Sequence, residues 1–197
     1  MIRLGLTGSI GMGKSTVAAM FRDAGIPVFD ADATVHALQG PAGALVGAIE
    51  AVFPGTTGAG GVDRAKLGAA VFGDDLAIRR LEAIVHPAVG DARAAFLATH
   101  ADAPLVVFDV PLLFETGGER GVEWIVVVSA AGDVQRARVL ARPGMTPEKL
   151  AAILARQTPD AEKRARADFV IPTDVPLSET RNAVARVIAC LLPDQAR

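Results

Sequence analysis

The sequence has one cysteine, no tyrosine and three histidines among its 197 residues. A single cysteine, Cys190, excludes an intrachain disulfide framework and a multi-cysteine zinc site. The net charge of −2 gives no broad basic field that would hold nucleic acid or an anionic membrane without specificity. The longest apolar runs, Trp124–Val128 and Val187–Leu192, are much shorter than the ~18 residues that a membrane-spanning helix needs.

The N-terminal stretch also lacks the apolar region and cleavage site of a signal peptide, because glycines and Lys14 interrupt it. We therefore expect a cytoplasmic protein with small-molecule substrates and no membrane or nucleic-acid partner, present as a monomer or weak homo-oligomer. A hydrophobic fraction of 51% over this length predicts a folded core, in one domain that can carry an insertion.

Five short apolar segments have the character of buried strands separated by helical stretches. They are Ile2–Thr7, Ile26–Phe29, Leu105–Asp109, Trp124–Val128 and Phe169–Ile171. The first two strands, with the helix expected at Ser15–Ala24 between them, form a βαβ unit, which favours a parallel sheet. The predicted fold class is α/β, a five-stranded parallel sheet flanked by helices.

The segment between the second and third strands, about seventy-five residues, is far longer than one crossover needs. It contains a glycine-rich loop, Gly55–Gly61, and a helix break expected at His86-Pro87, with Pro87 in the first turn of the next helix. The expected helices are Ala33–Leu38, Ala42–Val52, Asp63–Phe72, Asp74–His86 and Ala88–Thr99. We interpret residues 33–100 as a helical acceptor-binding subdomain inserted in a core made of residues 1–32 and 101–197.

The stretch Asp133–Arg166 is helical in pattern, with breaks at Arg142-Pro143-Gly144 and at Thr158-Pro159. Arg138 and Arg142 are expected on one face of a helix, where they form either part of a lid over residues 138–160 or a solvated basic face, with Arg136 nearby. Arg156 and Gln157 on the next helix could complete that lid. Ser178 is expected to cap the last helix, which runs to Leu192, and Cys190 and Trp124 are expected in the core.

The segment Gly8–Ser15 matches the phosphate-loop pattern G-x-x-x-x-G-K-[ST] between a strand and a helix. Its glycines permit positive φ values and a close approach of backbone N–H groups to phosphate oxygens. The N-terminus of the following helix adds partial positive charge. The pattern places Lys14 on the β and γ phosphates and the Ser15 hydroxyl on Mg²⁺, so ATP and Mg²⁺ are the expected cofactors.

Three other nucleotide-binding classes fit less well. A dinucleotide site requires G-x-G-x-x-G, whereas the glycine spacing here continues into Lys-Ser. A guanine-nucleotide switch requires Asn-Lys-x-Asp, but the single asparagine, Asn182, precedes alanine. A motor-type ATPase usually has a strand that ends in Asp-Glu, whereas Leu105–Asp109 continues into valine, which favours a small kinase.

Acidic residues follow two of the predicted strands. Asp30 and Asp32 close the second strand; either both cap the next helix or Asp32 acts as a base for an attacking hydroxyl, the role we favour. Asp109 closes the third strand, where it could hold magnesium through water. His36 is more typical of a packing or hydrogen-bonding residue than of a metal ligand. From the residues alone, a P-loop kinase of a small hydroxyl acceptor is predicted.

Taken in order, seven motifs resemble the dephospho-CoA kinase family over nearly the whole chain. They are Leu6–Ser15, Asp30–Asp32, Val62–Arg64, His86-Pro87, Asp109–Glu115, Arg142–Thr146 and Arg166–Ile171. Two departures are visible: Ser9 stands where the family usually has glycine, and Pro172-Thr173-Asp174 replaces an Asn-x-Gly turn near the adenine. The alternatives are another nucleoside or nucleotide kinase, and a non-catalytic P-loop switch.

The resemblance implies a P-loop nucleotide-kinase-like core, with the helical insertion and the lid. The implied reaction is ATP-dependent phosphorylation of the ribose 3′-hydroxyl of dephospho-CoA, giving CoA and ADP. The catalytic residues it implies are Asp32, Lys14 and Arg142. Nucleotide contacts are implied for Gly8, Gly11, Met12, Gly13, Lys14, Ser15, Thr16, Arg138 and Arg142, and metal contacts for Ser15 and Asp109. Acceptor contacts are implied for Asp32, Arg64, His86, Pro87, Leu112, Phe114 and Glu115.

Overall fold

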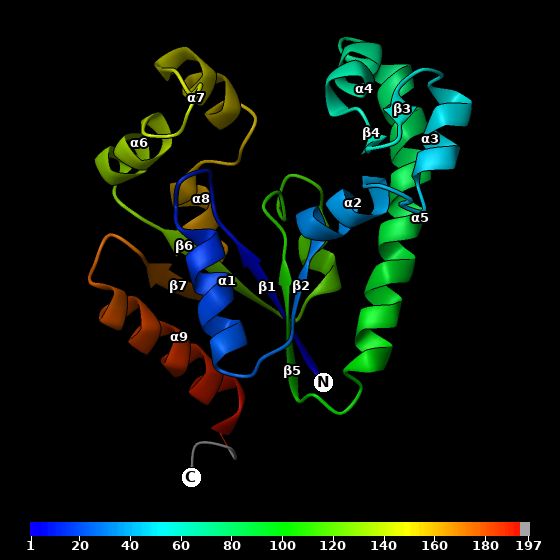
Figure 1. Cartoon of the computed structure of the whole chain (residues 1–197). Helices are drawn as coiled ribbons and strands as arrows, with labels where there is room; N and C mark the ends of the chain where they lie inside the picture. Colours follow the sequence, from blue (N-terminus) through cyan, green and yellow to red (C-terminus); the bar gives the residue numbers. More distant parts are fainter. Residues whose placement is uncertain (194–197) are drawn as a thin grey trace. The chain divides into compact units, whose positions relative to one another are not determined.

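The structure, a computed structural model, describes residues 1–193 and contains two compact units (Figure 1). The first unit consists of Met1–Phe29 and the chain from Asp102 onward, and the second is Asp30–Ala101. Asp32 thus belongs to the second unit, although the boundary expected from the sequence assigns residues 1–32 to the core.

The first unit is built on one sheet with the strand order β2-β5-β1-β6-β7. Its strands are β1 (Ile2–Thr7), β2 (Val28–Asp30), β5 (Leu105–Asp109), β6 (Trp124–Ser129) and β7 (Phe169–Pro172). The central strand β1 pairs in parallel with β5 and β6, and β6 pairs in parallel with β7. All residues of β5 are buried, as expected for a parallel strand covered on both faces. The predicted five-stranded parallel sheet is confirmed, and its strand ends bring distant segments of the chain to one edge.

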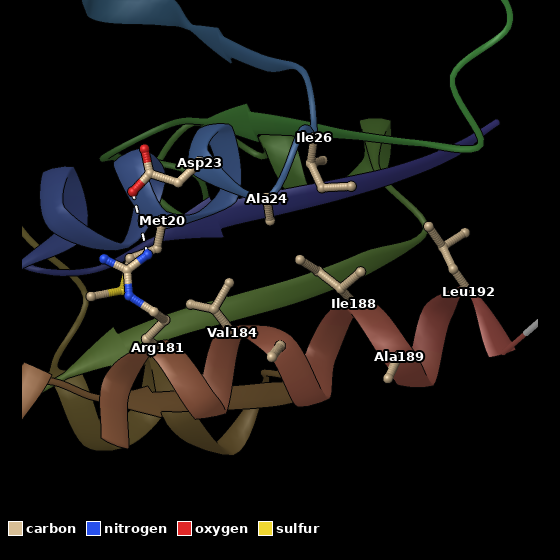
Figure 2. A pocket seen from close by; sticks show the side chains of 10 residues that line it. Met20, Asp23, Ala24, Ile26, Arg181, Val184, Ile188, Ala189 and Leu192 are labelled. Carbon is tan, nitrogen blue, oxygen red and sulfur yellow. Dashed lines mark hydrogen bonds and ion pairs between the residues drawn. The ribbon is translucent and has the colours of Figure 1, made fainter. Parts of the chain in front are cut away.

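Helices α1 (Lys14–Asp23) and α9 (Leu177–Leu191) pack on this sheet through a shared apolar core. In α1, Val17, Met20 and Phe21 recur every three or four residues and are buried along one face. Figure 2 shows the groove of about 390 Å³ that remains between the two helices, with the exposed Arg181–Asp23 ion pair at one end.

Three expectations about this unit are wrong. Helix α9 begins at Leu177, directly after Pro176, and no side chain caps it, so Ser178 lies inside its first turn. The fixed backbone of Pro176 sets the start of the helix without a capping hydroxyl. Cys190 is exposed on α9 rather than in the core. Trp124, at the start of β6, is 40% exposed, and its ring packs against the ring of Phe169 on β7.

The chain between β5 and β7 contains a short 3₁₀ helix and three α-helices. These are η1 (Gly118–Gly121), α6 (Gly132–Leu140), α7 (Pro147–Leu154) and α8 (Asp160–Ala165). Helix α6 ends before Arg142, so the expectation that Arg138 and Arg142 share one helix face is wrong. Pro143 disfavours helical backbone in the residue before it, and Gly144 turns the chain with a φ of 73°. Gln157 likewise lies beyond α7 rather than on it.

The second unit is mostly helical, with a two-stranded hairpin. Its elements are α2 (Ala31–Gln39), α3 (Val46–Val52), β3 (Thr57–Gly58), β4 (Gly61–Val62), α4 (Arg64–Val71) and α5 (Asp75–Thr99). Leu45, Ile49, Phe53 and Leu67 are buried in its separate core. The glycine-rich loop expected at Gly55–Gly61 therefore contains the hairpin, which the sequence did not indicate.

Two helix boundaries in this unit differ from expectation. The helix expected from Ala42 begins at Val46, because Ala42 has a φ of 57°, which is outside the helical region. The break expected at His86-Pro87 is absent, and α5 runs through Pro87. An interior proline costs about 3 kcal/mol. Packing of the helix against the core on both sides of Pro87, through Ile84 and Ala88, offsets this cost.

Candidate active site

The segment Gly8–Ser15 joins β1 to α1, as the phosphate-loop pattern predicts. Gly11 and Gly13 adopt left-handed backbone with φ values of 79° and 88°, which residues with a Cβ rarely adopt. A Cβ on Gly8 would lie 2.7 Å from the Val128 carbonyl oxygen on β6. The three glycines of the loop are therefore required by backbone conformation or by close packing, and this turn holds the loop at the carboxyl edge of the sheet.

The N-terminus of α1 has no side-chain cap, and its Ncap residue is Gly13. Within residues 1–193, the N–H groups of Gly13, Lys14 and Ser15 donate to no other backbone group. Unpaired N–H groups at a helix N-terminus, with the positive end of the helix dipole, form an anion-binding site. The start of α1 is thus available for phosphate oxygens.

Lys14 forms an ion pair with Asp109, the last residue of β5. The Lys14 side chain is 17% exposed and that of Asp109 is 3% exposed. The two residues are 95 positions apart, and the pairing of β1 with β5 brings them together. The structure therefore joins the lysine of the loop to the acidic strand end that the sequence singles out for magnesium.

A pocket of about 320 Å³ adjoins the loop. The residues that line it are Gly11, Gly13, Thr16, Arg138, Arg142, Thr173, Leu177 and Thr180. Arg138 donates hydrogen bonds to the carbonyl and hydroxyl oxygens of Thr173, at 2.6 and 3.0 Å. The guanidinium of Arg142 has no hydrogen bond or ion pair within the described chain, so it is free to meet a ligand. The turn after β7, where the family pattern departs, forms one wall of this pocket.

In the second unit, Asp30 caps α2 by accepting a hydrogen bond from the Ala33 N–H at 2.8 Å, which confirms one of the two roles considered for it. Asp32 is exposed in the first turn of α2, and its carboxylate has no partner among residues 1–193. His36 and Arg64 meet at 2.6 Å between His36 Nε2 and Arg64 Nη1. Since Arg64 is always protonated, His36 Nε2 must be the acceptor.

The residues expected to contact an acceptor are divided between the two units. Arg64, His86 and Pro87 lie in the second unit, whereas the Leu112–Glu115 segment follows β5 in the first. Leu112 is 41% exposed and Phe114 only 7% exposed. The Phe114 ring has the guanidinium of Arg166 above it, at 4.2 Å from the ring centroid.

Glu115 forms an ion pair with Lys163, whose side chain is completely buried, at 2.8 Å. It also accepts a hydrogen bond from the Thr158 N–H at 2.7 Å. Burial opposes the charge of Glu115, but the hydrogen bonds from Lys163 and the Thr158 amide outweigh it and lower the pKa of the carboxyl. Glu115 thus binds the segment after β5 to α8 and to the chain before it.

Sequence reasoning did not find Lys163 or Gln135. Lys163 lies in the charged stretch Asp160–Arg164, which is typical of an exposed helix. Gln135 lies in α6 and is 8% exposed. A single glutamine among charged residues carries no signal of burial, so neither residue could have been found from local pattern.

A parallel sheet with a phosphate loop after its central strand and an ion-paired loop lysine defines a P-loop kinase fold. The family model for dephospho-CoA kinase matches residues 2–179. A dephospho-CoA kinase from Novosphingobium aromaticivorans is 63% identical over 188 residues, which cover 95% of this chain and 94% of that protein. The chain belongs to the dephospho-CoA kinase family.

Solved structures agree on the fold. A crystal structure from Thermus thermophilus is similar with a TM-score of 0.85 and 37% identity, covering 96% of this chain and 97% of that one. Dephospho-CoA kinase from Campylobacter jejuni is similar with a TM-score of 0.65, covering 96% of each chain. At 21% identity, the second likeness bears on the fold alone.

No helix in residues 1–193 is long and apolar enough to cross a membrane. In the same range, no three His, Cys, Asp or Glu side chains form a group that could hold a metal ion.

Proposed function

We propose that the chain transfers the γ-phosphoryl group of ATP to the ribose 3′-hydroxyl of dephospho-CoA, giving CoA and ADP. Membership of the dephospho-CoA kinase family over residues 2–179 carries this proposal. The geometry supports it, because the loop and the free N–H groups of α1 form a phosphate site beside a pocket of nucleoside size.

The phosphates of ATP bind at Gly8–Ser15, with the N–H groups of the loop and of the first turn of α1 as donors. Lys14 exchanges its ion pair with Asp109 for the β and γ phosphates, since both partners lie at the loop. Met12 contacts the phosphates through its backbone in the loop, and Thr16 contacts the nucleotide from the first turn of α1. The nucleoside occupies the pocket lined by Leu177 and Thr173, whose wall is the turn after β7 that stands in place of the Asn-x-Gly turn.

The Ser15 hydroxyl and the Asp109 carboxylate are the residues that would hold Mg²⁺. Both are hard oxygen donors, and Mg²⁺ usually binds through one or two carboxylates, phosphate oxygens and water rather than a cage of protein ligands. A site with few protein donors therefore fits this ion. When bound, it neutralises phosphate charge; Lys14 and Arg142 do the same from the protein side.

Arg142 is the residue that would close on the transferred group. It follows α6 in a turn with Gly144, lines the nucleotide pocket and has a guanidinium without another partner in residues 1–193. An arginine that arrives on closure stabilises the charge of the transition state. Arg138 instead holds Thr173 in place, so we assign it to the wall of the nucleotide pocket.

The second unit supplies the acceptor site and the base. Asp32 is an exposed carboxylate without a partner among residues 1–193, so its oxygens are available to accept a proton from the substrate hydroxyl. Arg64, fixed by His36, is suited to an acceptor phosphate. We assign His86, Pro87, Leu112 and Phe114 to the same substrate, as the family resemblance implies.

Glu115 has its charge committed to Lys163, so its role toward the acceptor is to fix the segment after β5. A net charge of −2 gives no basic field for nucleic acid, so we infer that the chain acts on small molecules. A cytoplasmic monomer or weak homo-oligomer stays part of the proposal.

Coupled measurement of ADP release tests the assignment. We expect Mg²⁺-dependent turnover with dephospho-CoA far above that with adenosine, AMP or water. Equal turnover of adenosine or AMP would contradict the substrate, whereas ADP release without any acceptor would indicate a nucleotide hydrolase.

A further inference from the structure

Two carbonyl groups of the phosphate loop are held by side chains from outside it. The Ile10 carbonyl accepts a hydrogen bond from Gln135 Nε2 at 2.7 Å. The Met12 carbonyl accepts one from the Thr173 hydroxyl, also at 2.7 Å. Carbonyl oxygens repel phosphate oxygens, so these hydrogen bonds keep the two carbonyl groups pointing away from the ligand.

The contact with Gln135 also determines where the next N–H group points. No peptide bond in residues 1–193 is cis, and in a trans peptide the carbonyl and the N–H point in opposite directions. Because Gln135 holds the Ile10 carbonyl, the Gly11 N–H faces the other way. That N–H donates to no backbone group in the described part of the chain, so it is available to a phosphate oxygen.

A second glutamine fixes the preceding peptide. The Ile10 N–H donates to Gln157 Oε1 at 3.1 Å. On the opposite side of the same peptide, the Ser9 carbonyl accepts from the Met12 N–H, also at 3.1 Å. Ile10 is therefore bound at both its N–H and its carbonyl by glutamine side chains, one from α6 and one from beyond α7.

Gly11 makes these contacts necessary. A Cβ there would lie 2.5 Å from Val139 Cγ2, so the position has room only for glycine. Glycine has little conformational preference of its own, and the peptide before it can rotate at low cost. The orientation of that peptide must come from hydrogen bonds, and Gln135, which is 8% exposed, is placed to supply one.

Gln157 is itself held in place. Its neighbour Thr158 donates its N–H to Glu115, and Glu115 is paired with the buried Lys163. The Gln157 N–H also donates to the Leu154 carbonyl at the end of α7, at 3.1 Å. The backbone that carries the Gln157 side chain is therefore held in place by one ion pair and two hydrogen bonds.

We propose that Gln135 and Gln157 are positioning residues for phosphoryl transfer, which hold the two peptide groups of Ile10 so that the Gly11 N–H faces the phosphates. The nature of the ligand, a nucleoside polyphosphate, rests on the proposed function. The orientation of the loop does not, and it can be measured without any substrate.

The test uses the full chain with Gln135→Met and Gln157→Met, which keep side-chain length but remove the hydrogen bond, and Arg136→Met as a matched control on the exposed side of α6. We expect each glutamine variant to raise the Kd for MgADP and the KM for ATP about tenfold, the effect of losing one part-buried hydrogen bond. The KM for dephospho-CoA should stay within twofold of wild type. Arg136→Met should leave all three constants unchanged.

The nucleotide-free protein gives a second readout, the ¹⁵N–¹H resonances of Ile10 and Gly11. Gln157→Met should shift the Ile10 resonance, whereas Gln157→Glu, which still offers an acceptor oxygen, should restore it. Wild-type MgADP affinity in both methionine variants, or an Ile10 resonance indifferent to residue 157, would overturn the proposal. If Gln135→Met does not fold, the half-buried position 157 decides alone. An absence of turnover with dephospho-CoA in wild type would refute the proposed function and leave the resonance test standing.

Discussion

Replacing Lys163 with methionine should destabilise the first unit more than any single surface change. The Lys163 side chain is fully buried and its ion-pair partner Glu115 is 14% exposed, at 2.8 Å. Removing one partner of a buried pair costs ~3–5 kcal/mol, because the remaining charge is left in a poor solvent. Glu115 keeps its hydrogen bond from Thr158 and some solvent contact, so we expect Lys163→Met to cost about 3 kcal/mol. For a chain of this length that is a fall in Tm of roughly 6–12 °C.

A double-mutant cycle separates the ion pair from the effects of packing. Glu115→Gln removes the charge but still accepts from Thr158, and it leaves Lys163 charged and buried. We expect the double variant, Lys163→Met with Glu115→Gln, to lose less stability than the sum of the two single losses, by a coupling of about 2 kcal/mol. Urea denaturation measures the free energy of unfolding of wild type, of each single variant and of the double variant. Arg181→Met is the control, because its pair with Asp23 is more than half exposed and contributes no more than ~0.5 kcal/mol.

The coupling should also depend on pH in one direction. The folded pKa of Glu115 lies below its ordinary value, so protonation favours the unfolded chain. The contribution of the pair is complete above about pH 4.3, the ordinary glutamate value, and is lost as the pH falls through the lower folded pKa. A Lys163→Met variant within 1 kcal/mol of wild type at pH 7, or single effects that simply add, would refute the reasoning.

Four further changes test the loop, the base and the closing arginine. Lys14→Ala should weaken ATP binding and slow turnover together. Asp32→Asn should leave MgADP affinity intact and lower turnover ~10²-fold or more. Near-normal turnover in Asp32→Asn would show that Asp32 is not the base. Arg142→Ala should lower single-turnover rates ~10²-fold or more and Arg136→Ala should do much less, so equal mild effects would make both merely solvated charges. Gly11→Ala should destabilise the chain by ~1–2 kcal/mol, because its φ of 79° is strained for alanine, and should abolish MgADP binding measured by calorimetry.

Features that depend on neighbouring residues in the sequence were predictable. The strands Ile2–Thr7 and Leu105–Asp109 are short, mostly apolar segments, one followed by a glycine and the other ending at an acidic residue, and the structure has both with the expected bounds. The phosphate loop is likewise complete within eight consecutive residues. In each case the residues within the segment are enough to determine its conformation, so the segment could be predicted.

Features decided by packing were predicted poorly. Pro87 reads locally as the start of a new helix, but contacts on both sides of it keep α5 continuous. Ala42 has strong helix propensity and yet takes a left-handed turn. Arg142 differs, because the reason for its position outside α6 is local: Pro143 disfavours helical backbone in the residue before it.

The side chains that orient the phosphate loop illustrate why a motif is only part of a site. Gln135 and Gln157 are 125 and 147 positions from Ile10, and nothing in their own neighbourhoods distinguishes them from surface glutamines. The glycines that give the loop its shape also leave its peptides free to rotate, so the loop requires partners that its own eight residues cannot supply. The fold supplies them from α6 and from the segment after α7, and the parallel order of β1 and β6 brings the start of α6 to the loop. The local pattern therefore identifies where phosphate binds, whereas the sheet order decides which residues make that loop competent to bind it.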